Sequence, residues 1–448
     1  MFNGTGDSGD SIMHYLFARF AFRHPLSFLD SWAKPLYVAL ASPFAQFDFS
    51  GIKIFNSLNT VISMLAAYLI AKRLNMNNSW FVPVILILGP MNFVLALSGL
   101  TEPLFATILA VGLCCLFYNH SIAGLIILSF LPFVRSEGLF LLVPVALYLL
   151  LQKKPASALW LVTGQLFYAI VGYSHFHNLL WFYHNNPYSL ISSYGHGEWN
   201  HYFDHMPIIA GSVTRYLLEI GFIAIPLFLL LKKETSTNLL PLSLIWVLFA
   251  TYFFFHVVAW RYGLFNSFGM LRIISGVSPL IAIISVYGYN KCEAFIKLFL
   301  KWPKSIGVVC ATIVIAINLV FMVNAIKGEQ AVGLAIKLST DEVAENKIAA
   351  YIKNKYPDYK NHVYFKASYL CVALDVDPYD LEKGPLATRQ DNSYPANSLF
   401  IWDDWFAGEE GGITPLTLNR DKTMVRDTSF SEVGAEGKSR IVTLYLKK

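Results

Sequence analysis

Long apolar runs dominate the chain up to about residue 325 and limit the folds open to it. They lie at residues 51–71, 80–98, 101–119, 121–134, 138–152, 156–173, 207–231, 238–258, 271–289 and 305–325. A helix that crosses a bilayer needs roughly 20 apolar residues, and fewer where it is broken or shielded by protein. Only 14% of the residues are charged, whereas a soluble chain carries about 25%. The sequence therefore predicts a polytopic α-helical membrane protein with about ten transmembrane helices.

Two parts of the chain depart from this pattern. Residues 36–47 are apolar but too short to span, so we expect a surface-lying or re-entrant piece there. Beyond Lys327 charged residues are frequent, and the spacing of apolar residues predicts a small α/β unit. We expect its helix at Asp341–Tyr356 and its strands at His362–Lys366, Leu399–Trp402 and Arg440–Leu446. The predicted domains are an outer loop with amphipathic or re-entrant helices (1–50), a transmembrane domain (51–326) and a soluble domain (327–448).

Lysine and arginine residues between the spans predict the orientation in the membrane. When the spans alternate, one side receives Lys72, Arg73, Lys153, Lys154, Lys232, Lys233, Lys291, Lys297, Lys301 and Lys304. The positive-inside rule makes this side the cytoplasm. The opposite side receives the N-terminus, the tail, and the loop 174–206, which contains no Lys or Arg. We therefore expect the soluble domain to be extracytoplasmic.

The stretch from Asp7 to His14 is an unusually polar opening for such a chain. If a helix begins near Asp10, this carboxylate and His14 share one helical face. Ala18 and Ala21 continue that face, and their small side chains would leave room for a substrate. We take Asp10, Asp7 and His14 as the candidate catalytic residues. The alternative is that Asp10 only caps the N-terminus of the helix.

The first ten residues are polar and glycine-rich, so they do not form a cleavable signal peptide. An N-terminus on the outer side without a signal is difficult to translocate. We therefore expect a further transmembrane helix ahead of this chain.

Charged side chains at the ends of the spans are candidates for substrate binding, because they are costly there unless paired or facing water. They are Glu102, Arg135, Glu137, Arg261 and Arg272. A guanidinium holds phosphate oxygens in bidentate fashion, so Arg261 and Arg272 suit an anionic head group that enters from the membrane. Arg135 and Glu137 are two residues apart and are therefore not expected to pair with each other along a helix. The structural alternatives are a helix-dipole role for Glu102, a carboxylate clamp for Arg135 and interfacial anchoring for Arg261.

Histidines crowd into the loop 174–206. His201 and His205 have the spacing of a metal site if the segment is helical. The alternative is an aromatic, hydrogen-bonding wall suited to a sugar ring, which makes His201 a candidate substrate-binding residue. The five cysteines have neither metal-site spacing nor a disulfide framework. No basic stripe of the kind that binds nucleic acid is present in the sequence.

Four stretches of the outer side form one recognisable set. They are the acidic stretch Asp7 to His14, its continuation from Ala18-Arg19 to His24-Pro25, Ser98-Gly99-Leu100-Thr101-Glu102-Pro103, and Arg135-Ser136-Glu137-Gly138. Over about residues 1–325, the set resembles bacterial integral-membrane glycosyltransferases of the GT-C fold, relatives of the protein-mannosyltransferase and aminoarabinose-transferase families. The family's base lies in the first outer loop, which matches Asp10 best and Asp7 second. Its acidic pair is adjacent or one apart, whereas two residues separate these two carboxylates here.

The resemblance implies an inverting hexosyl- or mannosyltransferase of the bacterial cytoplasmic (inner) membrane. Such an enzyme takes a sugar from a polyprenyl-phosphate carrier and passes it to a glycan, lipid or protein acceptor on the outer face. In this reading His14 positions Asp10 or the acceptor, and Arg272, with Arg261 or Arg135, stabilises the leaving phosphate.

The sequence does not decide whether a metal ion is bound, and it leaves two other functions possible. Asp7, Asp10 and Glu102 would form a Mg²⁺ or Mn²⁺ site if they converge. A membrane transporter or lipid-linked glycan flippase also places charges at helix ends. An O-antigen polymerase or ligase is the remaining alternative, and it would depend more on arginine and histidine in large outer loops.

Overall fold

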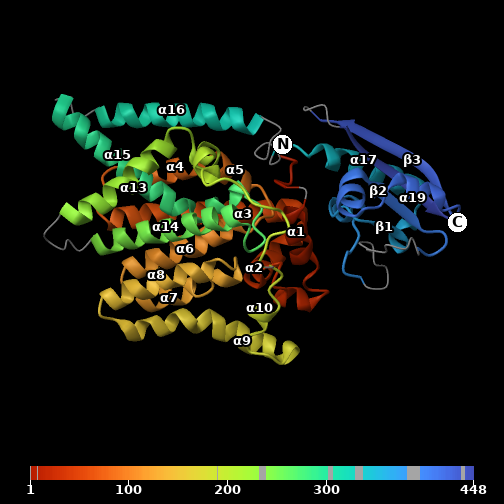
Figure 1. Ribbon diagram of the computed structural model, residues 1–448, viewed down its shortest axis with the longest axis horizontal. Helices are drawn as coiled ribbons and strands as arrows, with labels where there is room; N and C mark the ends of the chain where they lie inside the picture. The colour runs from red at the N-terminus through yellow and green to blue at the C-terminus, as the bar shows by residue number, and fades with distance from the viewer. Residues whose placement is uncertain are drawn as a thin grey trace.

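The computed structural model describes residues 2–7, 9–188, 190–231, 239–300, 306–327, 336–380, 394–434 and 439–448. It has a body of helices and a small tail domain, which lies beyond one end of that body (Figure 1). The N-terminus and the helices α1 and α2 lie at the end of the body that faces the tail. The first residues of the chain are thus close to its last domain.

The N-terminal region is built from short helices. They are α1 (Asp10–Phe20), η1 (Pro25–Leu29) and α2 (Pro35–Ala45). The predicted helix start near Asp10 is confirmed, and α2 packs between α1 and the long helix α3 (Asp48–Arg73). Tyr37 and Val38 of α2 are fully buried, whereas Leu40 is exposed. One face of the predicted surface-lying piece therefore packs against the helical body.

The helical body continues from α3 through interrupted segments. They are α4 (Phe81–Leu88), α5 (Pro90–Ala96), α6 (Glu102–Phe117), α7 (Ser121–Leu128), η2 (Leu131–Phe133), α8 (Gly138–Leu151), η3 (Pro155–Val162), α9 (Thr163–Phe176), α10 (Trp181–His184), α11 (His201–Asp204), α12 (Met206–Ala210), α13 (Thr214–Leu231), α14 (Leu239–Tyr262), η4 (Leu271–Val277), α15 (Ser278–Leu300) and α16 (Ile306–Lys327). The predicted run 80–98 is broken at Gly89-Pro90, because proline starts a new helix there. The predicted run 207–231 is broken at Gly211, whose φ of 114° favours glycine.

Apolar helices in the described residues make this a multi-pass membrane protein. Those long and apolar enough to span are Asp48–Arg73, Pro155–Phe176, Leu239–Tyr262, Leu271–Phe299 and Ile306–Lys327. Shorter apolar helices are Pro35–Ala45, Glu102–Phe117, Ser121–Phe133 and Gly138–Leu151. The predicted count of about ten transmembrane helices is not confirmed, because several predicted runs are short or interrupted. Lys232, Lys233, Lys301 and Lys304, used to predict orientation, lie outside the described residues.

The tail is the predicted α/β unit. Its elements are α17 (Thr340–Lys355), η6 (Tyr359–Asn361), β1 (Val363–Phe365), α18 (Tyr369–Leu374), β2 (Leu399–Asp403), the π-helix η7 (Asp404–Glu410), α19 (Pro415–Arg420), β3 (Met424–Val433) and β4 (Ser439–Lys447). The sheet has the order β1-β2-β4-β3, in which β1 and β2 are parallel and the other pairs antiparallel. The predicted helix and three predicted strands are confirmed. Strand β3 was not predicted, because its sequence is largely polar and half-exposed.

The predicted domain boundary near residue 326 falls where α16 ends, at Lys327. The connection 328–335 lies outside the described residues. On the other side of it, α17 packs on α18, β3 and β4.

Candidate active site

A cavity of about 370 Å³ opens among helix ends and the loops between them. Its charged lining residues are Asp10, Lys34, Glu102, Arg135, Glu137 and Arg272. Aromatic side chains make up much of the remaining wall; they include Trp32, Phe140, Phe182, Tyr183, Tyr188, Tyr194, Phe255, Phe265 and Phe268. The cavity is thus lined by a cluster of charged side chains and by a wall of aromatic rings.

Arg272 is the centre of the charged cluster. Nη1 donates to Asp7 Oδ2 at 2.8 Å, and Nη2 donates to Asp10 Oδ2. Nε lies 3.7 Å from Glu102 Oε1. The guanidinium side chain is only 12% exposed. The structure therefore brings together Arg272, the carboxylates of Asp7 and Asp10 near the N-terminus, and Glu102, three regions that are far apart in the sequence.

The turn that carries Glu102 is fixed by a buried amide. Asn56 of α3 is fully buried and donates to the carbonyl groups of Ser98 at 2.7 Å and Leu100 at 2.9 Å. Glu102 follows as the first residue of α6 and is 1% exposed. Its Oε2 atom has no hydrogen-bond partner among the described residues. Such a carboxylate depends on the neighbouring arginines for its charge balance.

Arg135 binds two carboxylates and shares Glu102 with Arg272. Its Nη1 donates to Glu102 Oε1 at 2.8 Å, and its Nε donates to Glu137 Oε1 at 2.7 Å. The prediction that Arg135 and Glu137 do not pair is wrong, because they lie in a turn between η2 and α8 and not along a helix. Burial opposes ionisation of Glu137, but the Arg135 guanidinium outweighs it and lowers the pKa of that carboxyl to about 2. These contacts are those that the carboxylate-clamp alternative for Arg135 expects.

Asp10 faces the cavity as the first residue of α1, and Gly9 is the N-cap residue. The capping alternative for Asp10 is therefore wrong. Asp7 is closer to that role, since its Oδ1 accepts a hydrogen bond from the Gly9 N–H at 2.7 Å. Burial would raise the pKa of Asp10, but the charge of Arg272 reverses this effect and leaves the pKa below its ordinary value.

His14 lies on the same face of α1 as Asp10 and lines the cavity. Its ring stacks on Trp32 with centroids 4.9 Å apart. Its Nδ1 has no hydrogen-bond partner in the part of the chain that the structure describes. Burial lowers the pKa of His14 to about 3, so the imidazole is neutral at physiological pH.

The alanines on this face do not leave room for a substrate, contrary to the prediction. Ala18 and Ala21 are both fully buried. Ala21 packs against Ala33 and Val38. Their small side chains instead allow α2 to approach α1 closely, which keeps α1 in place beside the cavity.

Arg261 and His201 are not among the residues that line the cavity. Arg261 Nη1 lies 3.4 Å from the Gly197 carbonyl oxygen, and His201 Nε2 lies 2.7 Å from that of Gly269. They stabilise the loop 190–200 and the turn after α14 instead. Among the described residues, no group of three His, Cys, Asp or Glu side chains is arranged for a metal ion. His201 belongs to a ring cluster with Trp260, as the aromatic-wall alternative expects.

Lys34 is a cavity residue that was not predicted. It is 5% exposed, has a φ of 70°, and lies with Nζ 4.6 Å from the ring centroid of Tyr188. Nζ also donates to the Ser31 carbonyl at 3.2 Å. The sequence did contain a signal for Lys34. It lies directly before Pro35 and the apolar residues 36–47, where an unpaired cation is costly.

The fold is that of a multi-pass membrane protein, and its charged groups gather around one cavity at the helix ends. No protein-family model matches the sequence, and no curated protein matches it significantly by sequence. The fold is similar to that of ArnT from Cupriavidus metallidurans, an aminoarabinose transferase. The ArnT structure bound to undecaprenyl phosphate has a TM-score of 0.62 and 11% identity, over 97% of this chain and 93% of that chain. For ArnT in the apo state, the TM-score is 0.62 at 10% identity, over 99% and 94%.

Proposed function

We propose that this protein is an inverting glycosyltransferase that moves a sugar from a polyprenyl-phosphate carrier to an acceptor on the outer face of a bacterial cytoplasmic membrane. The observation that carries the proposal is the convergence of Asp7, Asp10 and Glu102 on Arg272. A base and a phosphate-binding cation then stand side by side, as the displacement of a phosphate by a hydroxyl group requires. The fold similarity to an ArnT bound to undecaprenyl phosphate supports the same class of donor.

The donor phosphate would bind the cations of the cavity. Arg272 and Arg135 offer planar donors, and Lys34 adds a third positive charge on the cavity wall. All three side chains are largely buried, so their attraction for an anion is weakly screened by salt. Arg261 has no part in this proposal, because it does not line the cavity.

Asp10 would act as the general base. As the acceptor hydroxyl oxygen attacks the anomeric carbon, its proton passes to the Asp10 carboxylate, and the bond between that carbon and the phosphate oxygen breaks. The products are the new glycoside and polyprenyl phosphate, whose added negative charge is held by the cations. A single displacement inverts the anomeric centre. Asp10 is preferred to Asp7 because Asp10 lines the cavity, while both oxygens of Asp7 are already hydrogen-bonded.

Arg272 would link donor binding to the basicity of Asp10. Its charge holds the pKa of Asp10 below the ordinary value even though burial acts to raise it. A phosphate that binds Arg272 competes with Asp10 for the guanidinium. The freed carboxylate is then a stronger base at the moment when the leaving group is in place.

The sugar would lie against the aromatic wall of the cavity, which gives flat apolar faces beside polar groups. A hexose such as mannose fits this proposal, and the acceptor is a glycan, a lipid or a protein. The tail would lie on the extracytoplasmic side, at the same end as α1 (Figure 1), whose first residue lines the cavity.

A Mg²⁺ or Mn²⁺ ion fits these residues poorly. The three carboxylates expected to bind it face the Arg272 guanidinium, which a cation would have to displace. No step of the proposed reaction therefore passes through a metal.

The test is an assay of the purified protein in lipid with a panel of polyprenyl-phosphate sugars and membrane extract as acceptor. We expect one donor to give an inverted glycoside. Asp10→Asn should abolish transfer and leave membrane insertion intact. Asp48→Asn is the matched control, since Asp48 is an exposed carboxylate paired with Arg19 outside the cavity. Wild-type turnover by Asp10→Asn would remove Asp10 from the mechanism, and no transfer from any donor would refute the proposed function.

A further inference from the structure

The tail binds the N-terminal segment two residues before Asp7. The Thr5 hydroxyl donates a short hydrogen bond to the Glu342 carboxylate in the first turn of α17. Thr5 is 4% exposed and Glu342 is 1% exposed. A backbone hydrogen bond of 3.0 Å from Asn3 N to the Ile336 carbonyl lies beside this contact. The contact between tail and body is thus dry at the segment that carries the proposed base.

The same segment is bonded to the helical body on its other side. The Thr5 carbonyl accepts a hydrogen bond of 2.5 Å from Ser11 Oγ, which in turn accepts one of 2.7 Å from the Gly99 N–H. Gly99 lies in the turn that leads to Glu102. A continuous series of hydrogen bonds therefore runs from Glu342 through Thr5 and Ser11 to this turn.

The Glu342 side chain is itself held in one position. Its Oε2 accepts a hydrogen bond of 2.7 Å from the Ser339 N–H, and the Ser339 hydroxyl accepts one of 3.2 Å from the Glu342 N–H. This capping box fixes the carboxylate at the positive end of the α17 dipole. Burial raises the pKa of Glu342 even though Thr5 and Ser339 donate to it. Thr5 therefore meets an acceptor that has little freedom to move.

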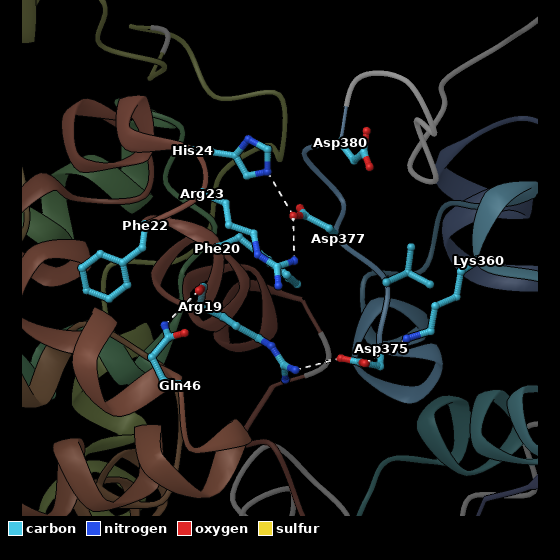
Figure 2. Close-up of a pocket in the computed structure, with 11 residues that line it drawn as sticks. Arg19, Phe20, Phe22, Arg23, His24, Gln46, Lys360, Asp375, Asp377 and Asp380 are labelled. Atoms are coloured by element: carbon cyan, nitrogen blue, oxygen red, sulfur yellow. Dashed lines mark hydrogen bonds and ion pairs between the residues drawn. The ribbon is translucent and has the colours of Figure 1, made fainter.

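A second contact between tail and body lies at the far end of α1. Figure 2 shows polar side chains from the end of α1 and from the tail around a cavity. The volume of this cavity is about 630 Å³. Arg19 binds Asp375 at 2.8 Å, and His24 lies 3.0 Å from Asp377. The side chain of Asp375 is 55% exposed, so water and salt weaken this pair. The contact at Thr5 is more deeply buried than the Arg19–Asp375 pair.

We infer that Thr5 and Glu342 are positioning residues, through which the tail holds Asp7 and Asp10 against Arg272. The inference rests on the proposed function, because it assigns the tail a role in the geometry of that reaction. Loss of the Thr5 hydroxyl leaves a buried carboxylate oxygen without its donor and lets the segment 2–7 shift. The base would then stand out of line with the donor phosphate.

The test compares Thr5→Val, which removes the hydroxyl at nearly equal volume, with Thr5→Ser, which keeps it. In the sugar-transfer assay, Thr5→Val should lower kcat on the order of 10- to 100-fold, the cost of a small misplacement. The donor KM should not rise, because no cation that binds the phosphate is removed. Thr5→Ser should restore kcat to within about threefold of wild type.

Glu345→Gln is the matched control on the same helix. Glu345 is also buried but makes no contact with the N-terminal segment among the hydrogen bonds of the described residues. Burial, with Asp403 nearby, raises the pKa of Glu345 well above its ordinary value, and glutamine keeps the size and shape of this side chain. This variant should turn over like wild type. Unchanged kcat in Thr5→Val, or an equal loss in Glu345→Gln, would overturn the inference.

Hydrogen–deuterium exchange separates this inference from the proposed function, because it needs no turnover. Exchange of residues 2–14 should rise in Thr5→Val and stay at the wild-type level in Thr5→Ser. If the wild-type protein transfers no sugar, the proposed function fails, and faster exchange in Thr5→Val still supports the link between tail and segment. Equal exchange in Thr5→Val and wild type would refute that link.

Discussion

Replacement of Arg272 by lysine or glutamine tests whether one guanidinium organises the cavity. Two charges about 4 Å apart interact by roughly 4 kcal/mol near a protein surface. The side chains of Asp7 and Asp10 are 29% and 39% exposed, so each pair is discounted to about 1 kcal/mol. Glu102 is 1% exposed but keeps Arg135 as a partner at 2.8 Å. We therefore expect Arg272→Gln to lower the free energy of unfolding by about 2–4 kcal/mol, because three carboxylates lose a shared cation.

Lysine keeps the charge but has no planar fork, so it cannot bind Asp7 and Asp10 at the geometry seen for Arg272. Arg272→Lys should cost only about 1 kcal/mol in stability, and it should lower kcat by about 10²- to 10³-fold, as the loss of a preorganised donor does. Thermal unfolding in lipid and the sugar-transfer assay measure the two quantities. Arg215→Lys is the control, since Arg215 pairs with Glu219 along α13 and lies outside the cavity. Full turnover by Arg272→Lys would refute the argument that the fork geometry matters.

The remaining predictions concern a neutral imidazole and the cavity cations. His14 has a folded-state pKa of about 3, below its ordinary 6.5, so its contribution to stability is present above pH 6.5 and is lost as the pH falls toward 3. In His14→Gln, the thermal unfolding temperature should fall less steeply between pH 6.5 and pH 3 than in the wild type. An equally steep fall would show that another group causes it. Lys34→Met should raise the donor KM about tenfold or more, since it removes a buried cation from the cavity. Arg261→Met should change the donor KM less than about twofold, because Arg261 lies outside the cavity; equal effects of the two variants would contradict this placement of the phosphate.

The sequence was informative where local rules determine structure. The apolar runs predicted the membrane class, and the apolar spacing predicted α17, β1, β2 and β4. The cost of charges at span ends correctly drew attention to Glu102, Arg135, Glu137 and Arg272, all of which line the cavity. Sidedness alone then indicated that these groups share one end of the helices.

Features that depend on the path of a turn were not predictable from spacing. Arg135 pairs with Glu137 because the chain turns between them. Arg261 lies near Gly197 because the loop 190–200 is hydrogen-bonded to the end of α14, where the Gly197 N–H donates to the Trp260 carbonyl. Lys34 enters the cavity from a left-handed backbone conformation that no periodic pattern reveals. The space beside Ala21 is likewise occupied by Ala33 and Val38, and the spacing within the first helix does not predict how these residues pack.

The charge balance of the cavity explains why donor binding and base activation should be one event. Three acidic residues, Asp10, Glu102 and Glu137, line it together with three cations, Lys34, Arg135 and Arg272, and the buried histidine beside Asp10 is neutral because burial lowers its pKa to about 3. Asp7, which does not line the cavity, adds a further carboxylate on Arg272. An anionic donor therefore enters a site whose cations are already matched by carboxylates, so it must replace a carboxylate as the partner of a cation. Glu102 and Glu137 are held by Arg135 at 2.8 and 2.7 Å, whereas Asp10 depends on Arg272 alone among its described ion pairs and is the most exposed of the three. Of the three carboxylates that line the cavity, the one released at the lowest cost is thus also the most exposed, so an acceptor hydroxyl would reach it most readily.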